Sequence, residues 1–204
     1  MPYNDLPNIL PIFPLHGVML LPNGRLPLNV FEPRYLAMVD DALASNRLIG
    51  IIQPREHGEQ ALYSIGCAGR MTEFVETDDG RYEIALSGLI RFSFNDELPL
   101  VNGYRRVTPD WNLYRDDILS DHNCLDFCRD KLRSLLGKYF TREGMECDWD
   151  AFEQASDGRL MTCLSMSCPF TAAEKQALLE EKCCKARAKM FITLLEIELC
   201  EGCY

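Results

Sequence analysis

The sequence has no long hydrophobic run. No window approaches the roughly eighteen uninterrupted apolar residues that a membrane-spanning helix needs. The first ten residues, MPYNDLPNIL, lack the positive start and the apolar centre of a secretory signal. Because 47% of the 204 residues are apolar, the chain can still bury a substantial core. We therefore expect a soluble cytoplasmic protein with no membrane partner.

Basic residues are also scarce. The chain has 21 Lys and Arg against 31 Asp and Glu, which gives a net charge of −10. Residues 1–110 carry −5 (9 against 14), and residues 111–204 also carry −5 (12 against 17). A nucleic-acid-binding protein normally needs a cationic face to replace phosphate counterions. Neither half offers such a face, so we expect no nucleic-acid partner.

The motifs of nucleotide-dependent and hydrolytic enzymes are missing as well. No window matches G-x-x-x-x-G-K-[ST], and no G-x-G-x-x-G follows an expected strand. None of the three histidines, His16, His57 and His122, stands in an H-E-x-x-H pattern, and no serine sits in a nucleophile elbow. We therefore expect no enzyme activity, no cofactor and no bound metal. A hydrolase remains a weak alternative, and it would need a thiolate beside one histidine in a cleft.

Cysteine, by contrast, is abundant, with ten in the chain. Without a secretory signal, reduced and mostly buried thiols are the simplest interpretation. Only Cys200-x2-Cys203 resembles half of a zinc site, and no second pair completes it. The alternative function is therefore a thiol-based metal-binding or redox protein that uses Cys200 and Cys203 with Cys163 or Cys168.

The first half of the chain has the two-residue period of strands. Residues 81–94 alternate between apolar and polar side chains, which predicts a long strand with one buried face. Gly88 falls on the apolar parity and indicates a bend or bulge, while Asp78–Gly80 predicts a hairpin with residues 61–75. Pro11 and Pro14 indicate that the first strand lies at an edge or is irregular. The remaining expected strands are Leu10–Leu15, Val18–Leu21, Leu26–Phe31, Leu48–Gln53 and Val101–Val107.

The second half has the period of helices. One apolar stripe predicts a helix from Asp116 to about Phe140, with a break at Gly144. Thr171 and Glu174 form a capping box that opens a final helix of about seven turns. Helices are also expected at Pro33–Ala44, Asp148–Ala155 and Asp157–Ser167. The predicted fold is α+β: an antiparallel pseudo-β-barrel with one inserted helix in residues 1–112, followed by a helical bundle in residues 113–204.

Two stretches carry a family resemblance. The first, Leu10–Ile52, contains in order Pro11-Ile12-Phe13-Pro14-Leu15, Pro22-Asn23-Gly24, Leu26-Pro27-Leu28, Phe31-Glu32-Pro33-Arg34-Tyr35 and Ile49-Gly50-Ile51-Ile52. The second contains Pro169-Phe170, Glu174-Lys175-Gln176, Leu178-Leu179-Glu180 and Arg187. Together they resemble the N-terminal substrate-binding domain of the Lon protease family, over nearly the whole chain.

The resemblance implies a PUA-like barrel, a helical bundle, and a non-catalytic role in engaging polypeptide substrates in a bacterial cytoplasm. The chain has neither the phosphate-binding loop of an ATPase nor a P-S-A-G-like segment around a serine. The family's proteolytic activity is therefore not expected here. The implied partners are unfolded or exposed polypeptide segments and an ATP-dependent protease to which this chain would act as an adaptor.

The resembling residues suggest two candidate sites. Glu32, Pro33, Arg34 and Tyr35 form a structural motif at the junction of a strand and a helix. Proline suits the first helical position, and Glu32 places negative charge at the helix N-terminus, where it can pair with Arg34.

The second candidate is a peptide-binding sheet edge at Pro11, Ile12, Phe13 and Leu15, where a partner could add a strand. An apolar groove between barrel and bundle is the alternative location for a bound peptide.

Overall fold

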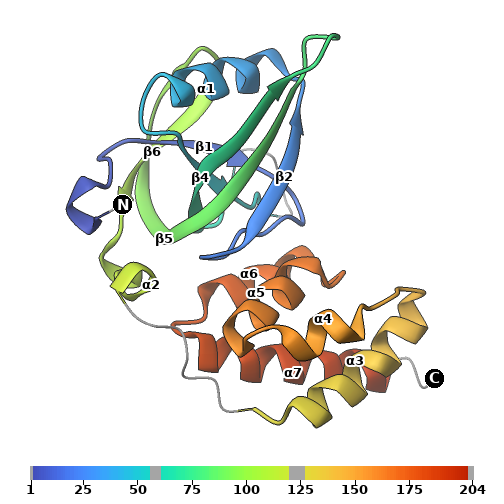
Figure 1. Ribbon diagram of the computed structural model, residues 1–204. Helices are drawn as coiled ribbons and strands as arrows, with labels where there is room; N and C mark the ends of the chain where they lie inside the picture. Colours follow the sequence, from blue (N-terminus) through green and yellow to red (C-terminus); the bar gives the residue numbers. More distant parts are fainter. Residues whose placement is uncertain (1, 56–60, 120–126, 202–204) are drawn as a thin grey trace.

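A computed structural model describes residues 2–55, 61–119 and 127–201 (Figure 1). The strands that it describes lie between Leu10 and Asp110, and helices α2 to α7 follow them. Figure 1 shows the strands together with helix α1 in the upper part of the molecule and the later helices below them. This arrangement confirms the α+β class, with a barrel followed by a helical bundle.

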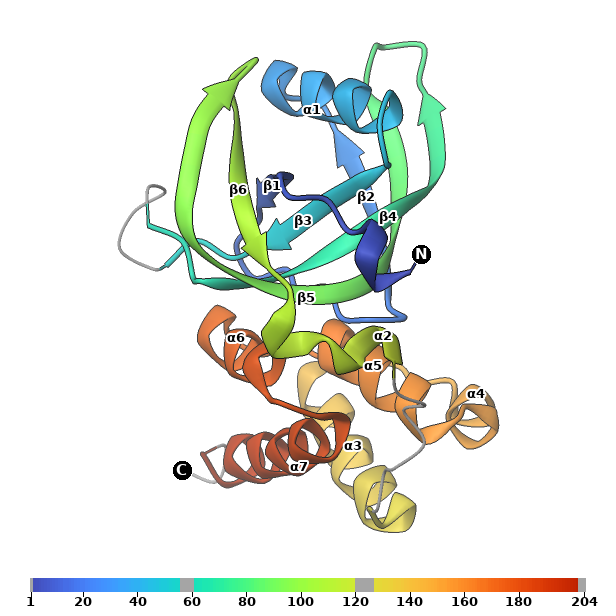
Figure 2. The ribbon, with the colours of Figure 1, turned by 90° about the vertical axis from the view of Figure 1, so that its left-hand side faces the viewer.

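Six strands form the barrel wall in the described part of the chain. They are β1 (Leu10–Pro14), β2 (Arg25–Val30), β3 (Leu48–Ile52), β4 (Ile65–Glu76), β5 (Tyr82–Val101) and β6 (Tyr104–Asp110). The ring runs β5–β4–β3–β1–β6 and closes because β6 also pairs with β5. Strand β2 pairs with the first part of β5. The long, curved β5 therefore pairs with β2 in its first part and with β6 in its last part, and Figure 2 shows its curvature.

The sequence pattern had suggested an antiparallel barrel, but one pair of strands runs parallel. Strands β1 and β3 run parallel, with Ile12 opposite Gly50 and Pro14 opposite Ile52. Parallel neighbours need a long crossover, and here β2 and helix α1 (Pro33–Leu43) lie in the connection between them. Alternation within each strand reports only which face is buried, so it could not reveal this direction.

Strand β1 is also not an edge strand. It pairs with β6 over Leu10–Ile12 and with β3 over Ile12–Pro14. The edge position, one of the two alternatives expected from the two prolines, is therefore wrong. Each proline removes a single donor, and a strand paired over only three residues on each side can tolerate two such gaps.

Gly88 marks an irregularity in β5, as predicted. The register of β4 and β5 shifts between Ala68 and Gly69, where Gly69 lies opposite Gly88. The glycine is required by the loop before β2, because an added Cβ would lie 1.9 Å from the carbonyl oxygen of Leu21. The same loop contains the expected strand Val18–Leu21, which pairs with no strand of the described residues and instead buries Met19, Leu20 and Leu21.

The local start and stop signals were mostly correct. Pro33 is the first residue of α1, and the turn at Asp78–Gly80 joins β4 to β5 with a φ of 77° at Gly80. Gly144 ends a helix with a φ of 66°, and the capping box at Thr171 is present. The helices after the barrel are α2 (Asp116–Leu119), α3 (Arg129–Glu143), α4 (Trp149–Gln154), α5 (Asp157–Ser167), α6 (Ala172–Glu180) and α7 (Cys184–Glu201); the 3-10 turns are Tyr3–Asp5 and Asn112–Tyr114.

Two helices predicted as continuous are interrupted. Cys128, just before α3, has an extended backbone with a ψ of 109°, so the stripe beginning at Asp116 does not run along one helix. The final helix also ends early, because Glu181 is extended with a ψ of 129° and α7 begins only at Cys184. The helical period reports which side chains can share a buried face and does not mark a change in backbone direction.

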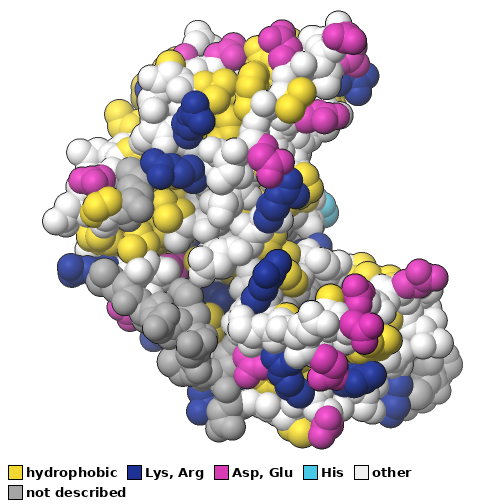
Figure 3. All heavy atoms as spheres, viewed as in Figure 1, with side chains coloured by type: hydrophobic (Ala, Val, Ile, Leu, Met, Phe, Trp, Pro, Cys, Tyr) yellow, Lys and Arg dark blue, Asp and Glu magenta, His cyan; other side chains and the backbone are white. Residues whose placement is uncertain are grey.

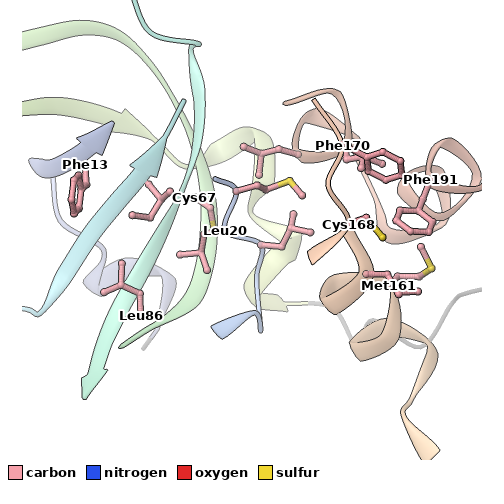
Figure 4. Packing of buried hydrophobic residues seen from close by; sticks show 14 of the residues in the cluster. Phe13, Leu20, Cys67, Leu86, Met161, Cys168, Phe170 and Phe191 are labelled. Carbon is pink, nitrogen blue, oxygen red and sulfur yellow. The ribbon is translucent and has the colours of Figure 1, made fainter. Parts of the chain in front are cut away.

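A single hydrophobic cluster spans the barrel and the helices. It includes residues from β1 to α7, and most of them are less than 9% exposed. Figure 4 places Leu20 between the barrel residues Cys67 and Leu86 and the helical residues Cys168 and Phe170. The loop before β2 is therefore an apolar segment that packs between the barrel and the helical bundle. A second cluster fills the barrel interior around Phe92.

Candidate functional site

An open groove of about 960 Å³ lies beside the end of β1. Four segments line it: the end of β1 with the loop after it, the N-terminus of α1, the loop after β3, and the β5–β6 hairpin. These segments are far apart in the sequence and meet because β1 lies between β3 and β6 in the ring. The groove is therefore a product of the barrel topology.

The apolar wall of the groove is an aromatic pair. The rings of Phe13 and Tyr35 have centroids 4.1 Å apart, and these residues are 6% and 7% exposed. The guanidinium of Arg34 lies 4.6 Å from the Tyr35 ring centroid, and its Nε donates to Glu32 Oε2 at 2.9 Å. The predicted Glu32–Arg34 pair is therefore present. It holds a cation over an aromatic face at the entrance to α1.

The β5–β6 hairpin forms the opposite wall and is fastened to α1. The expected strand Val101–Val107 is in fact the end of β5, a turn and β6. Gly103 has a φ of 84°, and an added Cβ there would lie 3.2 Å from Arg34 Cβ. Tyr104 donates its hydroxyl to Asp41 Oδ2 at 2.7 Å, and Asn102 donates to the same atom at 3.2 Å. Figure 2 shows the tip of this hairpin beside α1.

The Tyr104 hydroxyl is therefore a fixed donor. Burial and the hydrogen bond to Asp41 together raise the pKa of Tyr104 to about 12. The hydroxyl stays protonated at neutral pH, so this bond keeps the hairpin wall in place.

Charged side chains complete the rim. Arg105 donates from Nε to Glu97 Oε2 at 2.8 Å, and the guanidinium of Arg55 lies 5.5 Å from the ring centroid of Tyr63. Leu100, also on the hairpin, is 63% exposed. The groove thus combines an apolar wall with guanidinium groups and one large exposed aliphatic side chain.

The structure brings together most of the residues predicted from the sequence. Phe13, Leu15, Glu32, Arg34 and Tyr35 all line the groove. The structural motif and the second half of the proposed sheet edge are therefore parts of one surface.

Three predicted residues lie outside the groove lining. Ile12 is fully buried in the barrel interior, and Pro11 pairs with Arg106 of β6. Pro33 begins α1. A partner cannot add a full strand along Pro11–Leu15, because β6 already occupies one side of β1 up to Ile12.

Sequence reasoning missed the residues that the β5–β6 hairpin contributes, namely Glu97, Leu100, Gly103 and Arg105. Asn102-Gly103 was the available signal, since this dipeptide is typical of a tight hairpin turn. A turn alone would not have shown that the hairpin lies next to α1. That proximity depends on Asp41, which is more than sixty residues away along the chain.

The alternative location, between the barrel and the bundle, has a packed centre. Leu20 and Leu21 are at most 1% exposed there, and an added Cβ at Gly24 would lie 2.3 Å from Met166 Sδ. Lys175 Nζ donates to the carbonyl of Gly17 at 2.9 Å. Figure 3 shows that the surface is hollowed on one side between the two parts. A peptide site in that hollow remains a prediction.

A buried charged network also crosses this junction. Arg91 of β5 is 2% exposed, and it donates to both carboxylate oxygens of Asp117, at 2.9 and 2.8 Å. It also donates to the carbonyls of Leu179 and Glu181, at the end of α6. Burial opposes the charge of Arg91, but the hydrogen bonds and charge of Asp117 raise its pKa above the ordinary value. Arg91 thus supplies donors to carbonyl groups at the end of α6, where a helix leaves its last carbonyls without intrahelical partners.

The cysteines are less buried than expected. Of the eight that the structure describes, only Cys67 and Cys168 are buried, while Cys128, Cys163, Cys183 and Cys200 are exposed. Burial raises the pKa of Cys168 to about 12 and also raises that of Cys67, which makes both poor nucleophiles.

The metal and hydrolase alternatives involve residues in and outside the described part of the chain. Cys203, His57 and His122 lie outside it. Within residues 2–55, 61–119 and 127–201, no three His, Cys, Asp or Glu side chains are grouped so that they could hold a metal ion. His16 lines the groove, and none of the groove's lining residues is a cysteine.

Fold and groove together define a small α+β protein, in which a barrel carrying an open groove precedes a helical bundle. Two solved structures share this fold. A Lon N-terminal domain protein from Xanthomonas campestris has a TM-score of 0.64 and 23% identity, covering 91% of this chain and 97% of that one. The N-terminal domain of a Mycobacterium avium complex Lon protease has a TM-score of 0.64 and 16% identity, covering 92% and 98%.

Residues 9–196 match the family model of the ATP-dependent protease La (LON) substrate-binding domain, and the chain belongs to that family. It is 26% identical to a Lon protease of Anaeromyxobacter dehalogenans, over 94% of this chain and 23% of that protein. Lon protease 2 of Myxococcus xanthus is likewise 26% identical, over 94% and 24%. The chain thus spans about a quarter of the length of these bacterial relatives. None of the helices described here is long and apolar enough to cross a membrane.

Proposed function

We propose that the protein recognises other polypeptides by binding exposed apolar or extended segments in the groove beside β1. The observation that carries this proposal is the open groove of about 960 Å³ in a chain of the LON substrate-binding domain family. Ligand-binding clefts typically measure about 300–1,000 Å³, so this one has room for a short stretch of polypeptide.

The groove offers both contacts that an extended segment needs. An apolar side chain can pack against Phe13 and Tyr35, with Leu100 closing over it from the hairpin. Strand β1 pairs with β6 only as far as Ile12, so its last residues have no strand partner on that side within the described chain. Short main-chain pairing with a bound segment is therefore compatible with the sheet.

Leu100→Asp should weaken binding of an unfolded polypeptide by about tenfold or more, because it places a charge where an apolar contact is made. The affinity would be measured by fluorescence anisotropy with a labelled, chemically unfolded model protein. Leu100 is 63% exposed, so the folded state should tolerate the change.

Leu113→Asp is the matched control, since Leu113 is 58% exposed and lies in the 3-10 turn Asn112–Tyr114, outside the groove lining. It should leave the affinity unchanged. Equal binding by both variants and the unchanged protein would contradict a site in the groove, and so would an equal loss in both variants.

We further propose that the protein acts as an adaptor, delivering bound polypeptides to an ATP-dependent protease. Family membership supports this role, because the bacterial relatives that it matches are Lon proteases. In a reconstituted degradation assay, adding the protein should change the rate at which a Lon protease degrades an unfolded substrate. The Leu100→Asp variant should have much less effect. A rate that is the same with and without the protein would contradict the adaptor role while leaving polypeptide binding intact.

A further inference from the structure

The groove carries a charge opposite to that of the whole chain. Three guanidinium groups line it, from Arg34, Arg55 and Arg105, against two carboxylates, from Glu32 and Glu97. Three minus two leaves +1, whereas the chain as a whole carries −10. A local cationic site on an acidic protein favours acidic ligands at that place alone.

The three arginines are not equivalent. Arg34 pairs with Glu32, and Arg105 pairs with Glu97, so their charges are largely compensated. Arg55 lies over the ring of Tyr63, and within the described residues no carboxylate pairs with it. Among the described residues of the groove, its guanidinium is therefore the one that keeps donors for an incoming carboxylate.

Arg55 is also held in place next to the groove. Its backbone N–H donates to the carbonyl of Ala61 at 2.8 Å, and Pro54 forms an isolated bridge with Leu62. The backbone at Arg55 is thus tied to residues 61–63, one of which carries the ring beneath its guanidinium. A fixed cation lies in the same groove as the aromatic wall of Phe13 and Tyr35.

We propose that the groove prefers polypeptide segments in which an acidic side chain lies next to an apolar one. This inference rests on the proposed polypeptide-binding function and names the class of segment recognised. The apolar side chain packs on the Phe13–Tyr35 wall, and the carboxylate accepts hydrogen bonds from Arg55. The net charge of −10 opposes binding of acidic segments elsewhere on the surface. The local positive charge therefore gives the groove selectivity for acidic segments as well as affinity.

The test uses three labelled peptides of equal length with the same Phe-Leu centre, flanked by Glu, by Gln or by Lys. Their dissociation constants would be measured by fluorescence anisotropy at low ionic strength. An exposed charge pair predicts that the Glu peptide binds roughly two- to fivefold tighter than the Gln peptide. Added salt should reduce this difference, because it screens the interaction.

Arg55→Gln should abolish the difference between the Glu and Gln peptides, because it lowers the affinity for the Glu peptide more than the affinity for the Gln peptide. Arg133→Gln is the matched control, because Arg133 also lies over an aromatic ring, that of Trp149 at 5.2 Å, but in the helical part. This control should keep the full preference.

The outcomes separate the two proposals. If the Gln and Glu peptides bind equally well, or the Lys peptide binds best, the acidic preference is wrong and polypeptide binding stands. The preference is also wrong if Arg55→Gln retains it. If no peptide binds more tightly than a flexible Gly-Ser peptide, the proposed function fails together with this inference.

Discussion

Asp117→Ala is expected to lower the free energy of unfolding by about 3–5 kcal/mol, because it leaves the buried guanidinium of Arg91 without its counter-charge. The two side chains are only 6% and 2% exposed, and the guanidinium is held by two parallel hydrogen bonds. The remaining acceptors of Arg91, the carbonyls of Leu179, Glu181 and Lys182, hydrogen-bond to it without neutralising its charge. The measurement is equilibrium unfolding in urea.

Glu73→Ala is the control for Asp117→Ala. Glu73 pairs with Arg25 at 2.7 Å, but both side chains are 59% exposed, so the loss should stay below about 1 kcal/mol. Similar losses for the two variants would mean that burial of the Arg91–Asp117 pair does not matter. Asp117→Asn, which keeps an acceptor but removes the charge, should fall between the unchanged protein and Asp117→Ala.

Gly88→Ala is the second substitution with a large expected effect, a loss of about 3 kcal/mol or more. The added methyl group would lie 1.9 Å from the carbonyl oxygen of Leu21 and 2.7 Å from its carbon. Both are backbone atoms, so no rotamer change can relieve the clash. The loop is also hydrogen-bonded to Gly88. The N–H of Asn23 donates to the Gly88 carbonyl at 2.9 Å, and the N–H of Gly88 donates to the Gly24 carbonyl at 2.8 Å.

Moving this loop would disturb the contact between barrel and bundle as well, since Leu20 and Leu21 are buried there. We therefore expect Gly88→Ala to lower the thermal unfolding midpoint as well.

Gly137→Ala is the control for Gly88→Ala, and it should raise stability instead of lowering it. Gly137 lies within α3, the nearest atom to an added Cβ is 4.0 Å away, and alanine favours a helix. The free energy of unfolding of that variant should rise by about 0.5–1 kcal/mol. If both glycine variants changed stability in the same direction, the close approach at Gly88 would not be the reason.

The sequence by itself predicted the features that depend on neighbouring residues. Pro33 begins α1, Gly144 ends α3, and Thr171 with Glu174 caps α6, because each signal acts within one turn of a helix. The bulge at Gly88 followed from its place in the alternating pattern. The Glu32–Arg34 pair could be predicted because its members are two residues apart.

The sequence predicted the groove only in part. Phe13 and Tyr35 belonged to the resembling motifs, but nothing in the pattern linked them to Leu100 or Arg55. A strand's period reports which face is buried and gives no information about its neighbour. Hence the pairing of β1 with both β3 and β6 could not be derived, and β1 was expected to be an edge strand or an irregular one.

What the sequence alone determined is therefore most of the strands and helices, the fold class and the family. Tertiary structure decided which elements meet: the closing of the ring between β5 and β6, the hydrogen bonds from Arg91 to the carbonyls at the end of α6, and the groove itself. The physical reason is distance along the chain. Caps and turns are stabilised by contacts within a few residues, whereas the groove and the Arg91 network depend on contacts between segments that come together only when the barrel closes.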